Sequence, residues 1–127
     1  MMTVLAMQPC PSPLWLGVRG RACGIPVEVA RTASRRLLGW LGRRDAPVGK
    51  GLWLVPCDAV HTFAMRFAID LVFVDAAGRI LRIDHWVSAW RLRVCIGAFS
   101  VIELDAGLAG AVGLAVGDEL ELREECA

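Results

Sequence analysis

Side chains with catalytic or ligand-binding chemistry gather between residues 61 and 75, in the stretch HTFAMRFAIDLVFVD. His61 has the chemistry of a general base or a metal ligand, although a lone histidine near a strand start is more often a structural residue. Asp70 has the chemistry of an acid, a base or a ligand contact. Asp70 stands in the otherwise apolar run 69–74, where burying an unpaired carboxylate would cost several kcal/mol. We therefore favour an internal role in which Asp70 accepts hydrogen bonds, with a ligand-facing carboxylate as the alternative.

Arg66 is the expected partner of Asp70. The two residues are four apart, and an even spacing places both side chains on the same face of an extended strand. Met65 lies beside Arg66 in the same stretch. Glu103 is a further carboxylate, which would share a face with Val101 on a predicted strand and point toward the interior or toward the helix.

Two tryptophans, Trp86 and Trp90, flank a segment that also carries Arg91 and Arg93. Exposed rings beside arginines could stack on a sugar or a nucleobase, although such tryptophans more often cover the end of a small core. We predict no catalytic residue. The candidate ligand-binding residues are His61, Met65, Arg66, Asp70, Trp86, Trp90 and Glu103.

The chain lacks the spacings that identify common metal and cofactor sites. Its five cysteines contain no C-x-x-C pair and its two histidines are far apart, which is not a zinc pattern. It has no glycine-rich phosphate loop and no serine in a nucleophile elbow. We therefore predict no metal and no cofactor. Free thiols are the expected state of the cysteines, and a Cys10–Cys23 disulfide is conceivable if the protein is exported.

Composition excludes a strongly charged protein, because the net charge is +1. Residues 19–50 carry eight basic against two acidic side chains, and residues 103–127 carry one basic against seven acidic. We expect these charges on solvated faces, with nucleic-acid binding by the arginine-rich segment 31–44 as a less favoured alternative. Although 56% of residues are hydrophobic, no run approaches the ~18 apolar residues of a membrane span.

The elements that would position these side chains are mostly strands. Alternating or continuous apolar runs predict strands over 25–30, 52–55, 69–74, 79–86, 100–104 and 119–122. Helical spacing predicts a helix over 33–41 and a short one over 106–112, capped by Asp105. A hairpin turn at 75–78 and an irregular loop at 87–99 complete the pattern.

This pattern predicts an α+β fold, mainly antiparallel β, with a small closed or nearly closed barrel and one or two short helices. With 127 residues, one domain is expected. We predict an N-terminal extension of poor order over residues 1–24, a single β-rich domain over 25–122, and a C-terminal tail over 123–127.

The order of these segments resembles the domain-of-unknown-function 192 family of small bacterial and archaeal proteins, over residues 25–122. Met65, Arg66, Ile69 and Asp70 match the central block of the family. The residues that match its C-terminal block are Glu103, Gly107, Gly117 and Asp118. This chain departs from the family at two places. It has Phe63-Ala64 where many members have a Trp before the Met. It has Phe67-Ala68 in place of the family's Asn-Thr, and the family's proline is missing. The resemblance implies the fold class, and the family has no established function.

We favour a small non-enzymatic binding or accessory domain, whose ligand or protein partner contacts the 61–70 stretch and the 86–95 loop. The first alternative is a hydrolase-like enzyme using Asp70 and His61, which requires both groups within about 3 Å of a common point in a cleft. The second alternative is nucleic-acid binding through 31–44. A cytoplasmic location is favoured over export, which the resemblance keeps open because some relatives are exported.

Overall fold

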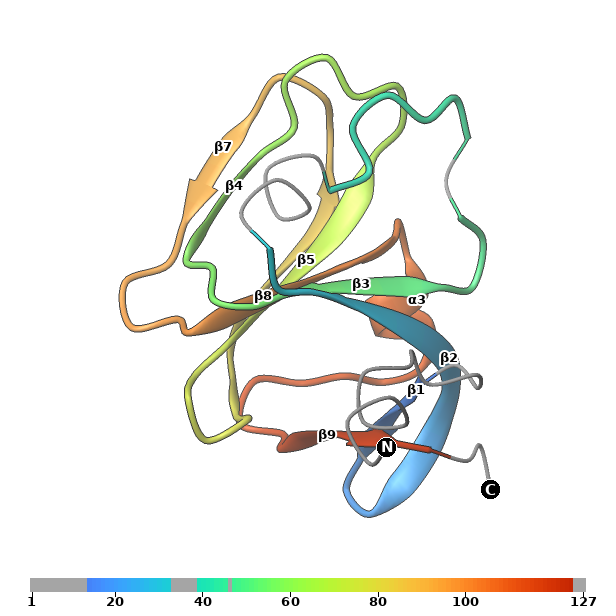
Figure 1. Cartoon of the computed structure of the whole chain (residues 1–127), viewed down its shortest axis with the longest axis vertical. Coiled ribbons are helices and arrows are strands. Elements are labelled where there is room, and N and C mark those ends of the chain that lie inside the picture. Colours follow the sequence, from blue (N-terminus) through green and yellow to red (C-terminus); the bar gives the residue numbers. More distant parts are fainter. Residues whose placement is uncertain (1–13, 33–38, 46, 125–127) are drawn as a thin grey trace, which may run out of the picture.

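The computed structural model describes residues 14–32, 39–45 and 47–124. It is mainly β (Figure 1). The strands are β1 (Leu14–Val18), β2 (Arg21–Ala30), β3 (Gly51–Leu54), β4 (Ala59–His61), β5 (Ile69–Val74), β6 (Ile80–Val87), β7 (Leu92–Val94), β8 (Ser100–Asp105) and β9 (Leu120–Arg123). Among the described residues the one helix is α3 (Leu108–Ala111), a single turn.

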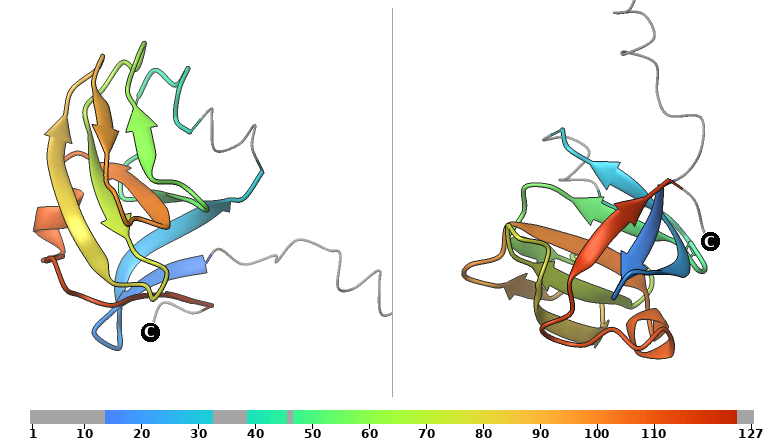
Figure 2. Two further views of the ribbon diagram at one scale, coloured as in Figure 1. Left: turned by 90° about the vertical axis from the view of Figure 1, so that its left-hand side faces the viewer. Right: turned by 90° about the horizontal axis from the view of Figure 1, so that it is seen from below.

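Seven strands form one curled sheet in the order β6-β5-β8-β3-β2-β1-β9 (Figures 1 and 2). Neighbouring strands are antiparallel except β2 and β3, which are parallel. The edge strands β6 and β9 approach each other through one bridge, between Arg79 and Glu119, in the described part of the chain. The sheet is therefore an open half-barrel, and the prediction of a closed or nearly closed barrel is corrected to a mainly β fold with an open barrel.

Strand β5 divides two hydrophobic cores, because all six of its residues are buried and successive side chains point to opposite faces. Val72 and Val74 belong to the first core, where they pack with residues of β1, β2, β8 and α3. Ile69, Leu71 and Phe73 belong to the second core. This second core lies between the curled sheet and a separate two-stranded ribbon, β4 and β7.

The β4–β7 ribbon lies on the left in Figure 1. Its register pairs Ala59 with Val94, Val60 with Arg93 and His61 with Leu92. The sequence predicts 87–99 as an irregular loop, whereas the structure places β7 in the middle of it. The short alternating segment was missed because three residues give too little periodicity to identify a strand.

Most predicted strands are confirmed, as is the 75–78 turn, in which Asp75 accepts backbone hydrogen bonds from Ala77 and Arg79. Two predictions differ from the structure, and a third is not tested by it. Residues 14–24, expected in the N-terminal extension, lie in β1, β2 and the turn between them. The predicted 33–41 helix falls largely outside the described residues. The predicted 106–112 helix is shorter, and Gly107, rather than Asp105, is its N-cap residue.

Candidate functional site

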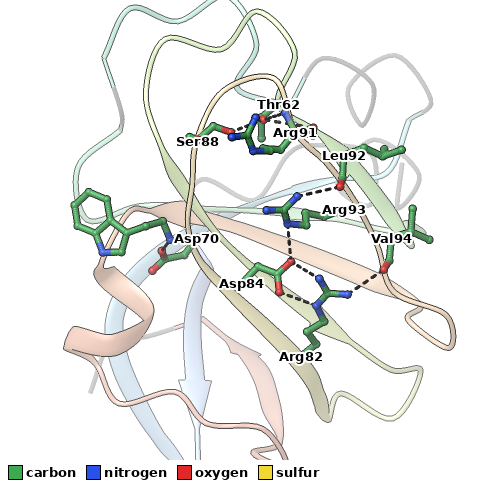
Figure 3. A network of polar contacts seen from close by, with 10 residues as sticks. Thr62, Asp70, Arg82, Asp84, Ser88, Arg91, Leu92, Arg93 and Val94 are labelled. Carbon is green, nitrogen blue, oxygen red and sulfur yellow. Dashed lines mark hydrogen bonds and ion pairs between the residues drawn. The ribbon is translucent and has the colours of Figure 1, made fainter.

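Asp70, labelled in Figure 3, is fully buried. Its carboxylate accepts three hydrogen bonds from backbone N–H groups. Oδ1 accepts from the N–H of Trp86 at 2.9 Å. Oδ2 accepts from the N–H groups of Gly107 and Ala109, both at 3.0 Å. Charge-assisted hydrogen bonds of this kind offset the cost of burying a carboxylate. The structure therefore shows the internal arrangement that the sequence analysis favoured.

The three donors to Asp70 come from two places where regular backbone pairing fails. Between the pairs Ile69–Val87 and Leu71–Asp84 the ladder shifts register, so that Trp86 lies in a β-bulge opposite Asp70. A bulge leaves a residue of the strand without its ladder partner, and the first turn of a helix leaves N–H groups without one. One carboxylate thus stabilises the bulge in β6 and the start of α3 together.

Arg66 does not hold Asp70, contrary to the prediction. Strand β5 begins at Ile69, so the two residues do not share one strand and the even-spacing argument does not apply. Arg66 is exposed. Within the described residues, the hydrogen bonds of Asp70 are the three from backbone N–H groups.

Glu103 and Asp70 lie on opposite faces of the sheet. Residue 70 pairs with Leu104, and Leu71 pairs with Glu103, so the Glu103 side chain points to the face of Leu71. Glu103 is buried beside Gly39, where an added Cβ would lie 2.9 Å from Oε1. The two buried carboxylates are therefore separated by the sheet and do not form an acidic pair.

Thr62 fixes the loop that precedes β7, a role that the sequence did not reveal. Its side chain is fully buried. The hydroxyl donates to the carbonyl of Ser88 at 2.7 Å and accepts from the N–H of Arg91 at 2.9 Å (Figure 3). Its own carbonyl accepts from the N–H of Trp90, also at 2.9 Å. A lone threonine in a strand-like stretch carries no sequence signal for such a role.

Trp86 and Trp90 are about two-thirds exposed, 66% and 65%, and both have positive φ angles, 51° and 66°. A bulky residue in this region costs of order 1–3 kcal/mol and persists where its surroundings enforce it. Asp70 holds the N–H of Trp86, and Thr62 holds the N–H of Trp90. Each exposed tryptophan therefore has its backbone fixed by a fully buried polar residue.

His61, Phe63 and Trp90 form a row of aromatic rings. The His61 and Phe63 ring centroids are 5.0 Å apart, and those of Phe63 and Trp90 are 6.0 Å apart with the planes 21° from parallel. The His61 Nδ1 accepts a hydrogen bond from the N–H of Phe63 at 3.3 Å. His61 therefore belongs to this row of rings on the ribbon, whereas Asp70 is hydrogen-bonded to the backbone of Trp86.

Strand β7 of the ribbon presents its apolar side chains to solvent and turns its arginine toward β6. In β7, Leu92 and Val94 are exposed and Arg93 points toward β6; in β4, Val60 is buried. Beyond the two strands, Phe63 and Trp90 are also exposed and Thr62 is buried. We call the outward set, with Ile96 in the following turn at 96% exposure, the ribbon face. Its members are Ala59, His61, Phe63, Trp90, Leu92, Val94 and Ile96.

Asp84 ties the inward side of β7 to β6. It accepts two hydrogen bonds from Arg82, at 2.6 and 2.8 Å, and forms an ion pair with Arg93 at 3.3 Å (Figure 3). Arg82 also donates to the carbonyl of Val94, and its hydrogen bond with Asp84 raises the pKa of the guanidinium. These side chains bridge the seam between β6 and β7, and thereby hold the ribbon in place.

The predicted site residues thus separate into groups. Asp70 and Trp86 are joined by a hydrogen bond, and His61 joins Trp90 through Phe63. Met65 and Glu103 are buried. Cavities of about 180, 270 and 290 Å³ are lined by described residues, and neither Asp70 nor His61 contributes to their walls.

Two features are absent from the residues that the structure describes, a metal-binding cluster and a membrane-spanning helix. In this part of the chain, no cluster of three or more His, Cys, Asp or Glu could hold a metal ion. No helix in it is long and apolar enough to cross a membrane. Cys23 and Cys95 are free thiols, and burial raises the pKa of Cys23. The suggested partner of Cys23, Cys10, lies outside the described residues.

Comparison with known proteins gives a family and two similar folds. The model of the DUF192 family, described as "Uncharacterized ACR", matches residues 16–122. A protein of unknown function from Novosphingobium aromaticivorans is 22% identical, with a TM-score of 0.72 over 86% of this chain and 83% of that one. A proposed transcription regulator from Sinorhizobium meliloti is 23% identical, with a TM-score of 0.76 over 87% and 92%. At these identities the similarity shows the fold alone. No curated protein matches the chain.

Proposed function

The chain belongs to the DUF192 family of uncharacterised proteins, and we propose that it is a small binding domain that contacts a protein partner through the ribbon face. The observation that carries this proposal is the inverted polarity of β7. Leu92 and Val94 point to solvent, whereas Arg93 points toward β6 and Thr62 is buried. A strand that covers a core normally has the opposite arrangement.

The size of the exposed apolar surface supports a contact. Taking about 200 Å² for a fully exposed large side chain, the exposed fractions of Phe63, Trp90, Leu92, Val94 and Ile96 amount to roughly 600 Å². The largest apolar patch on a monomeric protein is typically about 300–600 Å² and often functional. The ribbon face therefore lies at the upper end of what a protein exposes without a partner.

The fixed backbone around Trp90 also supports a contact. An aromatic anchor contributes most to an interface when its position is set before binding, because less conformational entropy is lost. Thr62 sets the position of Trp90 before binding, because its carbonyl accepts the N–H of Trp90 and its hydroxyl accepts the N–H of Arg91. Phe63 stacks on the Trp90 ring and restricts it further.

The alternatives receive less support from the geometry. A hydrolytic role would require Asp70 to release three backbone donors and to meet His61, which instead contacts Phe63 on the ribbon. The nucleic-acid alternative rests on Arg31, Arg35, Arg36, Arg43 and Arg44. Two of these, Arg35 and Arg36, lie outside the described residues, so this alternative stays a prediction.

Site-specific photocrosslinking in the host cell tests the proposal. The photoreactive residue p-benzoylphenylalanine is placed either at the position of Val94 on the ribbon face or at that of Val116. Val116 is a matched control, because it is an equally apolar, 65% exposed valine in the turn before β9. A discrete adduct is expected from position 94 and none from position 116. Adducts from neither position, or the same adducts from both, would contradict the proposal.

A further inference from the structure

We propose that the partner on the ribbon face is a second copy of this chain, related by a two-fold axis that sets the two β7 strands antiparallel. This inference rests on the proposed function, which it deepens by naming the partner. The ribbon face is a two-stranded sheet surface, and two such surfaces pack face to face about 10 Å apart. The arrangement would convert the exposed ribbon into half of a sandwich.

The ribbon face is compatible with itself because it carries no Lys, Arg, Asp or Glu. Its members are aliphatic or aromatic apart from His61. A two-fold axis places every group near its own counterpart or a symmetry mate, so a charged face would bring like charges together. Here the centre of the contact would hold Leu92 and Val94 of one copy against Val94 and Leu92 of the other. An apolar centre with aromatic residues is typical of homodimer interfaces.

The area suffices for a stable contact. Each copy exposes roughly 600 Å² at the ribbon face, so two copies would bury about 1,200 Å² in total, the lower limit for specific stable interfaces. With the axis at the level of residue 93, Leu92 of each copy meets Val94 of the other.

The first test is the solution mass of the purified full chain, measured by sedimentation equilibrium over a range of concentrations. We expect twice the chain mass of 13.8 kDa. Leu92→Asp should weaken association at least a hundredfold, because each copy would place a carboxylate in the apolar centre. Val94→Asp serves as a second variant, and Val116→Asp, with the same change of charge, should remain dimeric. Thermal unfolding verifies that each variant is folded.

The outcomes separate this inference from the proposed function. A wild-type chain that remains monomeric at all concentrations overturns the second-copy inference. If position 94 still crosslinks to a different protein in the cell, the proposed function stands with another partner. If the chain is monomeric and position 94 gives no adduct, both fail.

Discussion

Replacing Asp70 with Asn removes the charge of the buried carboxylate and changes its volume very little. Oδ1 accepts one backbone N–H and Oδ2 accepts two. The amide has one acceptor oxygen, which would remain on the side of Gly107 and Ala109, where it serves two donors. The amide NH₂ group would then face the N–H of Trp86, and that donor would lose its acceptor inside the protein.

The expected loss follows from these contacts. An unsatisfied buried donor costs about 1–3 kcal/mol, and replacing charge-assisted hydrogen bonds by neutral ones weakens the remaining two. We expect Asp70→Asn to lower the free energy of unfolding by about 2–4 kcal/mol. Asp70→Ala should lower it by about 3–5 kcal/mol, because all three donors lose their acceptor and a cavity remains.

Urea unfolding followed by tryptophan fluorescence measures these losses, and native-state hydrogen exchange locates them. The amides of Trp86, Gly107 and Ala109 should lose protection in Asp70→Asn beyond the global change. Asp105→Asn is the matched control, since Asp105 is the nearby acid that the sequence predicts as the helix cap and that makes no capping hydrogen bond. It should change stability by less than about 0.5 kcal/mol. A loss below about 1 kcal/mol in Asp70→Asn would refute the reasoning.

Further predictions concern other contacts. Thr62→Val, nearly isosteric, should cost about 1–3 kcal/mol in urea unfolding and weaken the near-ultraviolet circular dichroism of Trp90, because the Arg91 N–H loses its acceptor; an unchanged spectrum would contradict the role of Thr62. Gly78→Ala should cost at least about 1 kcal/mol, because φ is +88° and the added Cβ would lie 2.9 Å from the Leu120 carbonyl oxygen, whereas Gly113→Ala, at +76° with open space around it, should cost less. Burial raises the pKa of Cys23 above its ordinary 9.0, so the stability gained from its protonated thiol should be complete below pH 9 and be lost as the pH rises through the folded-state pKa. Unfolding of wild type and Cys23→Ala between pH 8 and pH 10.5 measures this, and parallel pH profiles would contradict it.

The strands could be predicted because their hydrophobic patterns are local. The run 69–74 is apolar on both faces, and the structure buries all of β5 between two cores. The burial of Asp70 followed from the same run. Its donors did not, because they lie 16, 37 and 39 residues away and belong to backbone groups of any residue type. Sequence reasoning therefore chose the nearest basic side chain, Arg66, which lies outside the strand.

The ribbon and the open barrel depend on tertiary contacts that no local pattern specifies. The alternation around Leu92 and Val94 is compatible with an apolar face turned either inward or outward. Arg93 points toward Asp84 on β6, and this leaves the apolar side in solvent. Likewise, barrel closure depends on whether the distant edges β6 and β9 pair along their length, and they meet at Arg79 and Glu119.

The central claim, that the ribbon face contacts a second copy of the chain, is tested most directly by the mass of the adduct formed from position 94 in the cell. The account predicts an adduct of twice 13.8 kDa, absent when the photoreactive residue replaces Val116 and lost when Leu92→Asp is added to the position-94 variant. An adduct of any other mass, no adduct from position 94, or an equal yield from position 116 would contradict it.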